Sequence, residues 1–252
     1  MGYSYVPLKL KNEVMRIKTA CRLTRGILDE LVAMTAPGIT TREIDLKCRK
    51  LIIKRGAEAG LLGFKGFPAV ICASVNHVAA HGVPNKYTLQ SGDIITLDLT
   101  AGVDGWYGDT AVTFGLGEIS REKADLIEAA RQATAAGINA AVAGARMGDI
   151  GEAVSRSARE HGYNVLRNFI GHGIGREIHE EPAVLYCGES GEGRPIVPGM
   201  VFTVEPILTP GKDEVETLID GWSVVTCDRM PCAQFEHTIA VFGDHTEILT
   251  EL

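Results

Sequence analysis

Four acidic residues stand at short apolar runs of the kind that form β-strands. Asp98 closes the run 94–97, and Glu205 closes a similar run in the second half of the chain. Asp109 and Glu236 each come just before another β-rich run. A carboxylate within a strand is costly unless it is paired or binds a metal ion. A single such acid is more often a strand-end residue that faces solvent, but four of them can converge on one point.

Three histidines stand near glycines or turns. His172 lies in the sequence GHGIG, His81 precedes Gly82, and His179 opens the sequence HEEP. Glycines beside an imidazole leave space around it and let another backbone approach closely. The GHGIG spacing differs from the G-x-G-x-x-G loop of dinucleotide-binding proteins, and HEEP differs from the H-E-x-x-H motif of zinc peptidases. A lone histidine is usually structural, but three of them beside converging acids indicate a polar site.

Helices and strands must position these residues. Apolar residues at helical spacing predict four helices, at 11–35, 41–56, 120–143 and 149–161. A capping box at Thr40 and Glu43 opens the second helix. Runs rich in β-forming residues predict six strands, at 70–78, 94–100, 110–114, 200–208, 222–226 and 235–242. Asp104-Gly105 suits a hairpin turn between two of them.

The order of long helix, short helix and strands occurs twice. Gly56 maps to Gly162 at an offset of 106 residues, and 91–98 maps to 198–205 at an offset of 107. Such a period is too long for a solenoid. It predicts two related halves of one α+β domain, with strands in a central sheet and helices outside. We therefore expect a single catalytic domain over 1–252, with halves at roughly 10–118 and 119–252.

The composition limits the compartment and the partners. The net charge is −7 and no basic run occurs, which argues against nucleic acid or an anionic membrane as a partner. No run of 18 apolar residues could span a membrane, and residues 1–10 lack the apolar core of a signal peptide. Six scattered cysteines without a C-x-x-C pair indicate reduced thiols. We therefore expect a cytoplasmic protein.

Several motifs together resemble those of type I methionine aminopeptidases, which have the creatinase-like "pita-bread" fold. The matching stretches are SVN at 74–76, HGVP at 81–84, LDLT at 97–100, DGWYGDT at 104–110, GHGIGR at 171–176, HEEP at 179–182, GMVFTVEP at 199–206 and QFEHT at 234–238. The resemblance covers nearly the whole chain from about residue 10. It implies an α+β fold with two pseudo-symmetric halves around a central curved sheet.

Chain length separates this family from its relatives. Only 97 residues precede Asp98, too few for the large N-terminal domain usual in prolidases. The 33 residues from His172 to Glu205 cannot contain the helical insertion of type II enzymes. A Cys/His-rich zinc extension is also missing. The resemblance is therefore to a short, bacterial-style type I enzyme, which removes an N-terminal methionine when the second residue is small.

The resemblance also implies a dinuclear metal site and roles for its neighbours. The implied ligands are Asp98, Asp109, His172, Glu205 and Glu236. One imidazole and many oxygens suit Mn, Fe(II) or Co better than Zn. Glu205 is implied to transfer protons. His179 is implied to contact the carbonyl oxygen of the bond that is cleaved, and His81 to contact its amide nitrogen.

The methionine pocket departs from the family pattern. The residues expected to line it are Phe64, Phe67, Cys72, His81, Ile178 and Trp222. The family commonly has Tyr in place of Phe64 and Phe67, and Phe in place of Ile178. The pocket stays apolar and still suits a thioether. Two alternatives stay open: a related aminopeptidase paralogue with altered specificity, and a non-catalytic binding protein on the same fold. We expect a monomer that acts on peptides or nascent proteins, with contact to the ribosome left open.

Overall fold

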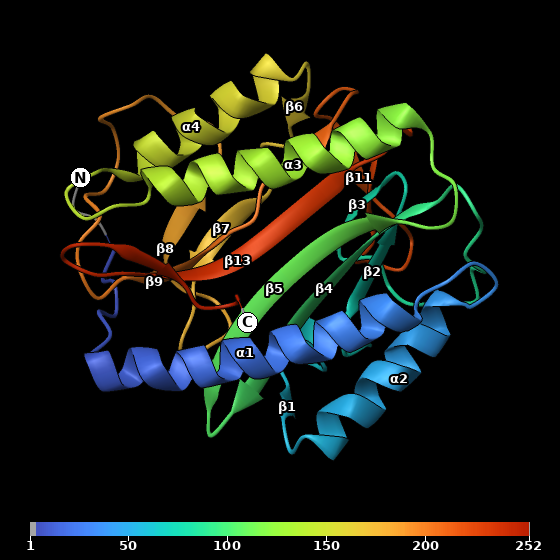
Figure 1. Ribbon diagram of the computed structural model, residues 1–252, viewed down its shortest axis with the longest axis horizontal. Coiled ribbons are helices and arrows are strands. Elements are labelled where there is room, and N and C mark those ends of the chain that lie inside the picture. The colour runs from blue at the N-terminus through green and yellow to red at the C-terminus, as the bar shows by residue number, and fades with distance from the viewer. Residues whose placement is uncertain (1–3, 252) are drawn as a thin grey trace.

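The computed structural model describes residues 4–251, and its four α-helices lie on one side of a large sheet (Figure 1). The helices are α1 (Lys11–Met34), α2 (Thr41–Lys54), α3 (Arg121–Ala140) and α4 (Met147–Glu160). All four agree with the predicted helices to within a few residues. The predicted capping box is present, because Thr40 Oγ1 accepts from Glu43 N at 3.2 Å and Glu43 Oε2 accepts from Thr40 N at 2.7 Å.

Within residues 4–251, eleven strands form the large antiparallel sheet and three form a smaller one. The main path of the large sheet is β1-β4-β5-β13-β9-β7-β8. Its strands are β1 (Glu58–Ala59), β2 (Cys72–Val75), β4 (Ile94–Val103), β5 (Trp106–Gly115), β6 (Asn164–Val165), β7 (Ile170–Gly173), β8 (Glu180–Leu185), β9 (Val201–Val204), β10 (Ile207–Thr209), β13 (Ala233–Val241) and β14 (Thr246–Ile248). The smaller sheet contains β3 (Val78–Ala80), β11 (Val215–Thr217) and β12 (Val224–Thr226).

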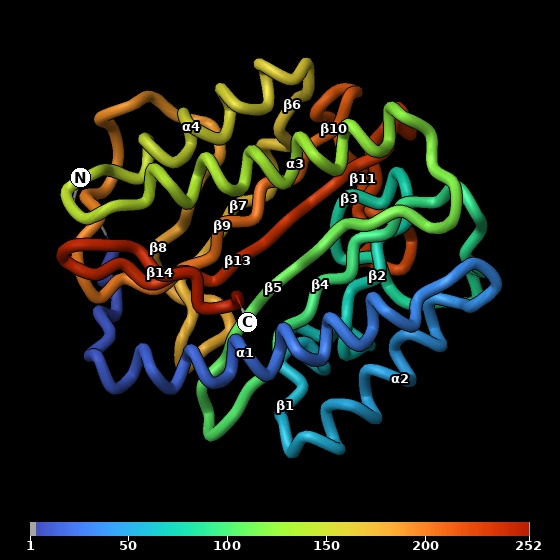
Figure 2. The backbone as a smooth tube through the Cα atoms, in the orientation of Figure 1, coloured from blue at the N-terminus to red at the C-terminus, as the bar shows by residue number. Residues whose placement is uncertain are grey.

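The two halves of the sequence meet at the centre of the large sheet. Strand β5 from the first half lies beside β13 from the second, and Glu236 is opposite Ala111 (Figure 2). Helices α1 and α3 flank this pair of strands on the helical side. The β4–β5 hairpin turns at Asp104 and Gly105, which have φ values of 53° and 68°, as a two-residue turn of this kind requires.

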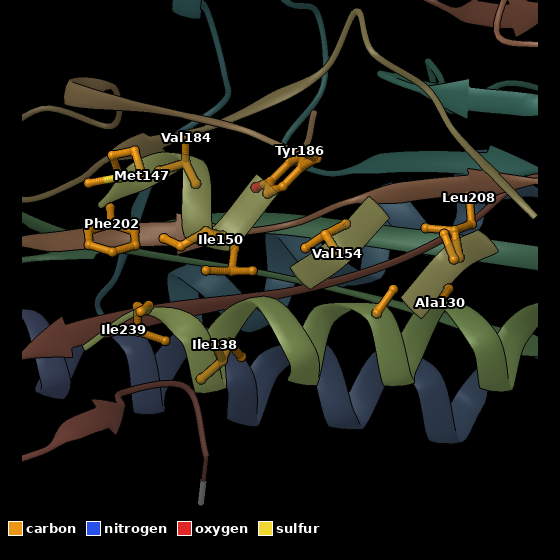
Figure 3. Packing of buried hydrophobic residues seen from close by; sticks show 14 of the residues in the cluster. Ala130, Ile138, Met147, Ile150, Val154, Val184, Tyr186, Phe202, Leu208 and Ile239 are labelled. Atoms are coloured by element: carbon orange, nitrogen blue, oxygen red, sulfur yellow. The ribbon is translucent and has the colours of Figure 1, made fainter. Parts of the chain in front are cut away.

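The side chains of β4 divide between two faces of the sheet. Ile95, Leu97 and Leu99 are completely buried and pack with apolar residues of α1 and α2. Successive side chains of a strand point to opposite faces, so Asp98 points away from the helices. In the second half, α3 and α4 pack against the sheet through a cluster that includes Ile138, Ile150, Val154, Phe202 and Ile239 (Figure 3). The helices therefore cover one face and leave the other for the polar residues.

Some strand predictions were wrong in detail. The predicted strand 70–78 is split at Asn76, whose φ is 53°. The predicted strand 200–208 is split between Val204 and Ile207, because Pro206 has no N–H to donate to a sheet. Asp109 and Glu236 lie within β5 and β13 rather than just before them. Both strands continue through polar residues, which a search for apolar runs does not detect.

Two further expectations can be compared with the described chain. All six cysteines are free thiols, as their scattered positions predicted. No helix within residues 4–251 is both long enough and apolar enough to cross a membrane.

Candidate metal centre

The strand register brings the predicted ligands to one face of the sheet. Asp98 on β4 is opposite Ala111 on β5, and Ala111 is opposite Glu236 on β13. Opposite residues in antiparallel strands share a face. Asp109 is two residues from Ala111 and therefore shares that face as well. Val204, the last residue of β9, is opposite His237 on β13. Glu205 directly follows β9, so the register places it opposite Glu236.

His172 reaches the same face from β7. Its neighbour Gly173 is opposite Phe202, so the antiparallel register places His172 opposite Thr203. The His172 amide donates to Thr203 Oγ1 at 3.0 Å, and that hydroxyl donates to Glu205 Oε1 at 2.6 Å. One threonine thus joins two of the predicted ligands.

The glycines around His172 allow the strands to lie this close. A Cβ atom on Gly171 would lie 2.4 Å from the carbonyl oxygen of Thr203. A Cβ atom on Gly173 would lie 2.1 Å from the carbonyl oxygen of Glu181. Real Cβ atoms do not approach backbone oxygens so closely, so both positions require glycine. The predicted close backbone approach beside His172 is therefore confirmed.

The ligand atoms lie within reach of a common cation. His172 Nε2 is 3.4 Å from Glu205 Oε1 and 3.9 Å from Asp109 Oδ2. One ligand atom from each of Asp109, His172 and Glu236 can be chosen so that all three lie within 4.8 Å of one another. His172 Nδ1 donates to the Gly173 carbonyl oxygen at 3.0 Å, which leaves Nε2 as the nitrogen with a free lone pair. The imidazole is thus oriented as a ligand.

The carboxylates are crowded in a buried place. Burial, followed by repulsion from Asp109, raises the pKa of Asp98 and Glu236 well above the usual range. Burial also raises the pKa of Glu205 well above its usual range. Burial lowers the pKa of His172 to about 4, so the ring is neutral at pH 7. The four acids repel one another when they are ionised, and the neutral imidazole supplies no positive charge to offset them.

These residues fit divalent cations. Asp109 Oδ1 is a buried carboxylate oxygen without a hydrogen-bond partner among residues 4–251, whereas Asp109 Oδ2 accepts from Thr100 Oγ1 at 2.8 Å. A bound cation would satisfy this oxygen and would offset the negative charge of its neighbours. Oxygen ligands with one imidazole are typical of sites for Mn, Fe(II) or Co.

The centre opens into a cavity of about 270 Å³. Its walls include all five predicted ligands and five of the six residues expected to line the methionine pocket, namely Phe64, Phe67, Cys72, His81 and Trp222. Phe67 packs edge-on against Trp222 at 5.2 Å between ring centroids. Ile178 is buried but does not line the cavity, which differs from the prediction. The next residue, His179, occupies the wall instead.

A family model for metallopeptidase family M24 matches residues 15–242. Methionine aminopeptidase A of Synechocystis is 42% identical over 246 residues, which cover 97% of this chain and 97% of that protein. The chain belongs to metallopeptidase family M24. Among solved M24 structures, methionine aminopeptidase from Rickettsia prowazekii superposes with a TM-score of 0.96 at 38% identity and covers 98% of this chain and 100% of that one.

The M24 fold extends to more distant proteins. Prolidase from Pyrococcus furiosus is 21% identical and superposes with a TM-score of 0.78 over 97% of this chain and 65% of that one. This likeness concerns the fold alone. It agrees with the predicted pita-bread architecture of a central antiparallel sheet with helices outside.

Two residues that contact Glu205, namely Gln234 and Tyr186, were not predicted from the sequence. Gln234 Nε2 donates to the Glu205 backbone oxygen at 3.3 Å and lies 3.4 Å from its Oε2. The Glu205 amide donates to the Tyr186 hydroxyl at 2.7 Å. The sequence signal for Gln234 was its place in the QFEHT motif, two residues before Glu236. Tyr186 gave no such signal, because its contact depends on the packing of distant strands.

Proposed function

We propose that this M24 metallopeptidase is a methionine aminopeptidase that removes the N-terminal methionine of peptides and proteins when the second residue is small. The observation that carries the proposal is the convergence of five metal-ligating side chains beside a largely apolar cavity. The likeness to methionine aminopeptidases over nearly the full chain supports this activity.

The proposed centre holds two divalent ions. The proposed ligands are Asp98, Asp109, His172, Glu205 and Glu236. The orphaned Asp109 oxygen and the neutral His172 ring support the binding of cations. We propose Mn, Fe(II) or Co as the metal, with Zn less suited. Such ions supply Lewis acidity, which polarises a carbonyl group and acidifies water.

Glu205 is the proposed proton carrier. One of its oxygens accepts from Thr203 and the other faces Gln234, so its position is held from two sides. A carboxylate held in this way is positioned to take a proton from water and pass it to the leaving amine.

Two exposed histidines of the cavity wall are proposed to contact the scissile peptide bond. His179 stacks obliquely beside His172 with ring centroids 4.0 Å apart, close to the proposed metal ligands. It is proposed to donate to the carbonyl oxygen as negative charge develops there. His81 lies near Trp222 and Phe169 and is proposed to contact the amide nitrogen.

The methionine side chain is proposed to lie in the apolar part of the cavity. Phe67 and Cys72 are 3% and 2% exposed, and they form one apolar cluster with Leu61 and Trp222. Such a wall suits an unbranched thioether. The free α-amine of the substrate then lies at the metal centre, which limits cleavage to the first residue.

The test is release of methionine from Met-Ala-Ser after Co(II) or Mn(II) is added to metal-stripped enzyme. We expect release to depend on the metal. Asp109→Ala should abolish both metal binding, measured by calorimetry, and turnover. Asp244→Ala is a matched control, because Asp244 is an exposed carboxylate with no part in the cavity. Absence of activity with any metal, or faster release of another residue, would contradict the proposal.

The proposal extends to localisation, oligomeric state and domain organisation. We propose that the protein is a cytoplasmic monomer that acts on the N-termini of peptides and nascent proteins. Contact with the ribosome is left open. We also propose that 1–252 is one catalytic domain of two related halves, although 1–3 and 252 lie outside the described residues. The shared β5–β13 pair supports this organisation. A paralogue with altered specificity would release other residues, and a non-catalytic binding protein would bind no ion tightly.

A further inference from the structure

The mouth of the cavity carries one residue that the proposed reaction does not use. Lys65 lines the cavity and is exposed. Among the described lining residues it is the only lysine or arginine. It has no carboxylate partner within residues 4–251: its only recorded close contact is with the Phe64 ring, whose centroid is 5.2 Å from Nζ.

Lys65 is held in place by a closed turn. It has a φ of 47°, in the left-handed region that side chains other than glycine, asparagine and aspartate rarely adopt. Backbone hydrogen bonds from Gly63 to Phe67 and from Phe67 to Phe64, both 2.9 Å, close the loop around it. The loop therefore keeps an uncommon backbone conformation at the cavity mouth, where it presents an ammonium group.

Lys65 lies close to the histidine that is proposed to contact the scissile bond. The Phe64 ring packs edge-on against His179, with centroids 5.1 Å apart. If His179 contacts the scissile carbonyl, the peptide beyond the cleaved bond leaves past this loop. Lys65 then faces the residues that follow the second position of the substrate.

The charges around the cavity indicate which chemical group Lys65 binds. Four carboxylates carry a charge of about −4, and two divalent ions offset it. Lys65 is the only lysine or arginine among the described lining residues, so it is the basic side chain that the chain itself places at the mouth. An unpaired ammonium attracts an anion, and the anion that a peptide offers is a carboxylate.

We propose that Lys65 forms a subsite for a carboxylate on the substrate downstream of the scissile bond. This inference rests on the proposed function. The carboxylate can come from an Asp or Glu side chain or from the C-terminus of a short peptide. A pair of this kind near a protein surface corresponds to about a 1.5- to 5-fold preference in kcat/KM at low salt.

Three peptides separate the sources of the carboxylate. Methionine release is measured from Met-Ala-Asp-amide, Met-Ala-Asn-amide and Met-Ala-Asn with a free C-terminus. We expect kcat/KM for the first and third peptides to exceed that for the second by about 1.5- to 5-fold, chiefly through a lower KM, and the difference to shrink as KCl rises. A preference for only one of the two carboxylate-bearing peptides shows whether Lys65 binds the side-chain carboxylate or the C-terminal one. Equal kcat/KM for all three, at low salt, would overturn the proposal.

Variants of Lys65 test the residue itself. Lys65→Met keeps an unbranched side chain and should abolish the preference, while cleavage of the neutral peptide continues. Lys65→Glu should reverse the preference, and Lys65→Arg should keep it. Lys50→Met is the control, because Lys50 is an exposed lysine on α2, across the sheet from the cavity. A preference that survives Lys65→Met would refute the subsite. Failure to release methionine from every peptide would instead refute the proposed function.

Discussion

An ion pair between Lys9 and Glu180 joins the N-terminal segment to the start of β8, directly after His179. The two side chains are 6% and 9% exposed. Glu180 Oε1 also accepts from the amides of Arg176 and Glu177, at 2.8 and 3.2 Å. These bonds close the turn that leads into His179. Lys9 therefore holds the segment that carries His179, which is proposed to contact the substrate. Lys9 and His179 lie 170 residues apart in the chain.

Lys9→Met removes one partner and leaves the carboxylate buried. Breaking a buried pair in this way costs about 3–5 kcal/mol. Two backbone amides still bind Glu180, so we expect about 3 kcal/mol less stability, near the lower end. For a chain of this size the melting temperature should fall by about 6–12 °C. The kcat for methionine release should fall by about tenfold, because the turn before His179 loses its anchor.

Lys18→Met is the matched control for this change. Lys18 pairs with Glu247, but those side chains are 19% and 31% exposed. A more exposed pair contributes about 1 kcal/mol or less, so the control should melt within about 4 °C of the wild type. Thermal and urea unfolding of the metal-loaded proteins measure both changes, and Lys9→Arg should restore most of the loss. If Lys9→Met and Lys18→Met destabilise equally, the reasoning from burial is refuted.

Two further predictions concern the strands and the ligands. Gly171→Ala should lower the free energy of unfolding by about 1–3 kcal/mol and weaken metal binding, because its Cβ would lie 2.4 Å from a backbone oxygen of β9. Gly243→Ala is the control, because a Cβ at that position would have no atom within 4 Å, and it should change little in the same denaturation assay. The raised pKa values of Glu205 and Glu236 stabilise the metal-free protein below about pH 4.3, and this contribution is lost as pH rises through the raised values. Bound metal removes that loss, so the rise in melting temperature on adding Mn(II) should be larger at pH 8 than at pH 5.5; a rise that is equal or smaller at pH 8 would contradict this.

Local patterns in the sequence were enough to predict the elements. The four helices follow from apolar spacing within one chain segment, and the capping box at Thr40 involves residues only three apart. The β4–β5 hairpin follows from Asp104-Gly105, since two residues decide its turn. Alternation along β4 also placed Asp98 on the face opposite the buried leucines. Such features depend on neighbours in sequence, which the sequence shows directly.

The sequence by itself indicated which residues are proposed to carry the chemistry, because the motifs around Asp98, His172 and Glu236 resemble those of the family. Only the tertiary structure decided how they meet. The register across β4, β5 and β13 aligns Asp98 and Asp109 with Glu236, which lies more than 100 residues further along the chain, and no local rule sets that register. The same is true of the Lys9–Glu180 pair, and of Ile178, which is buried outside the cavity that was expected to include it. Long-range strand pairing and packing settle these positions, since they depend on contacts that sequence spacing does not encode.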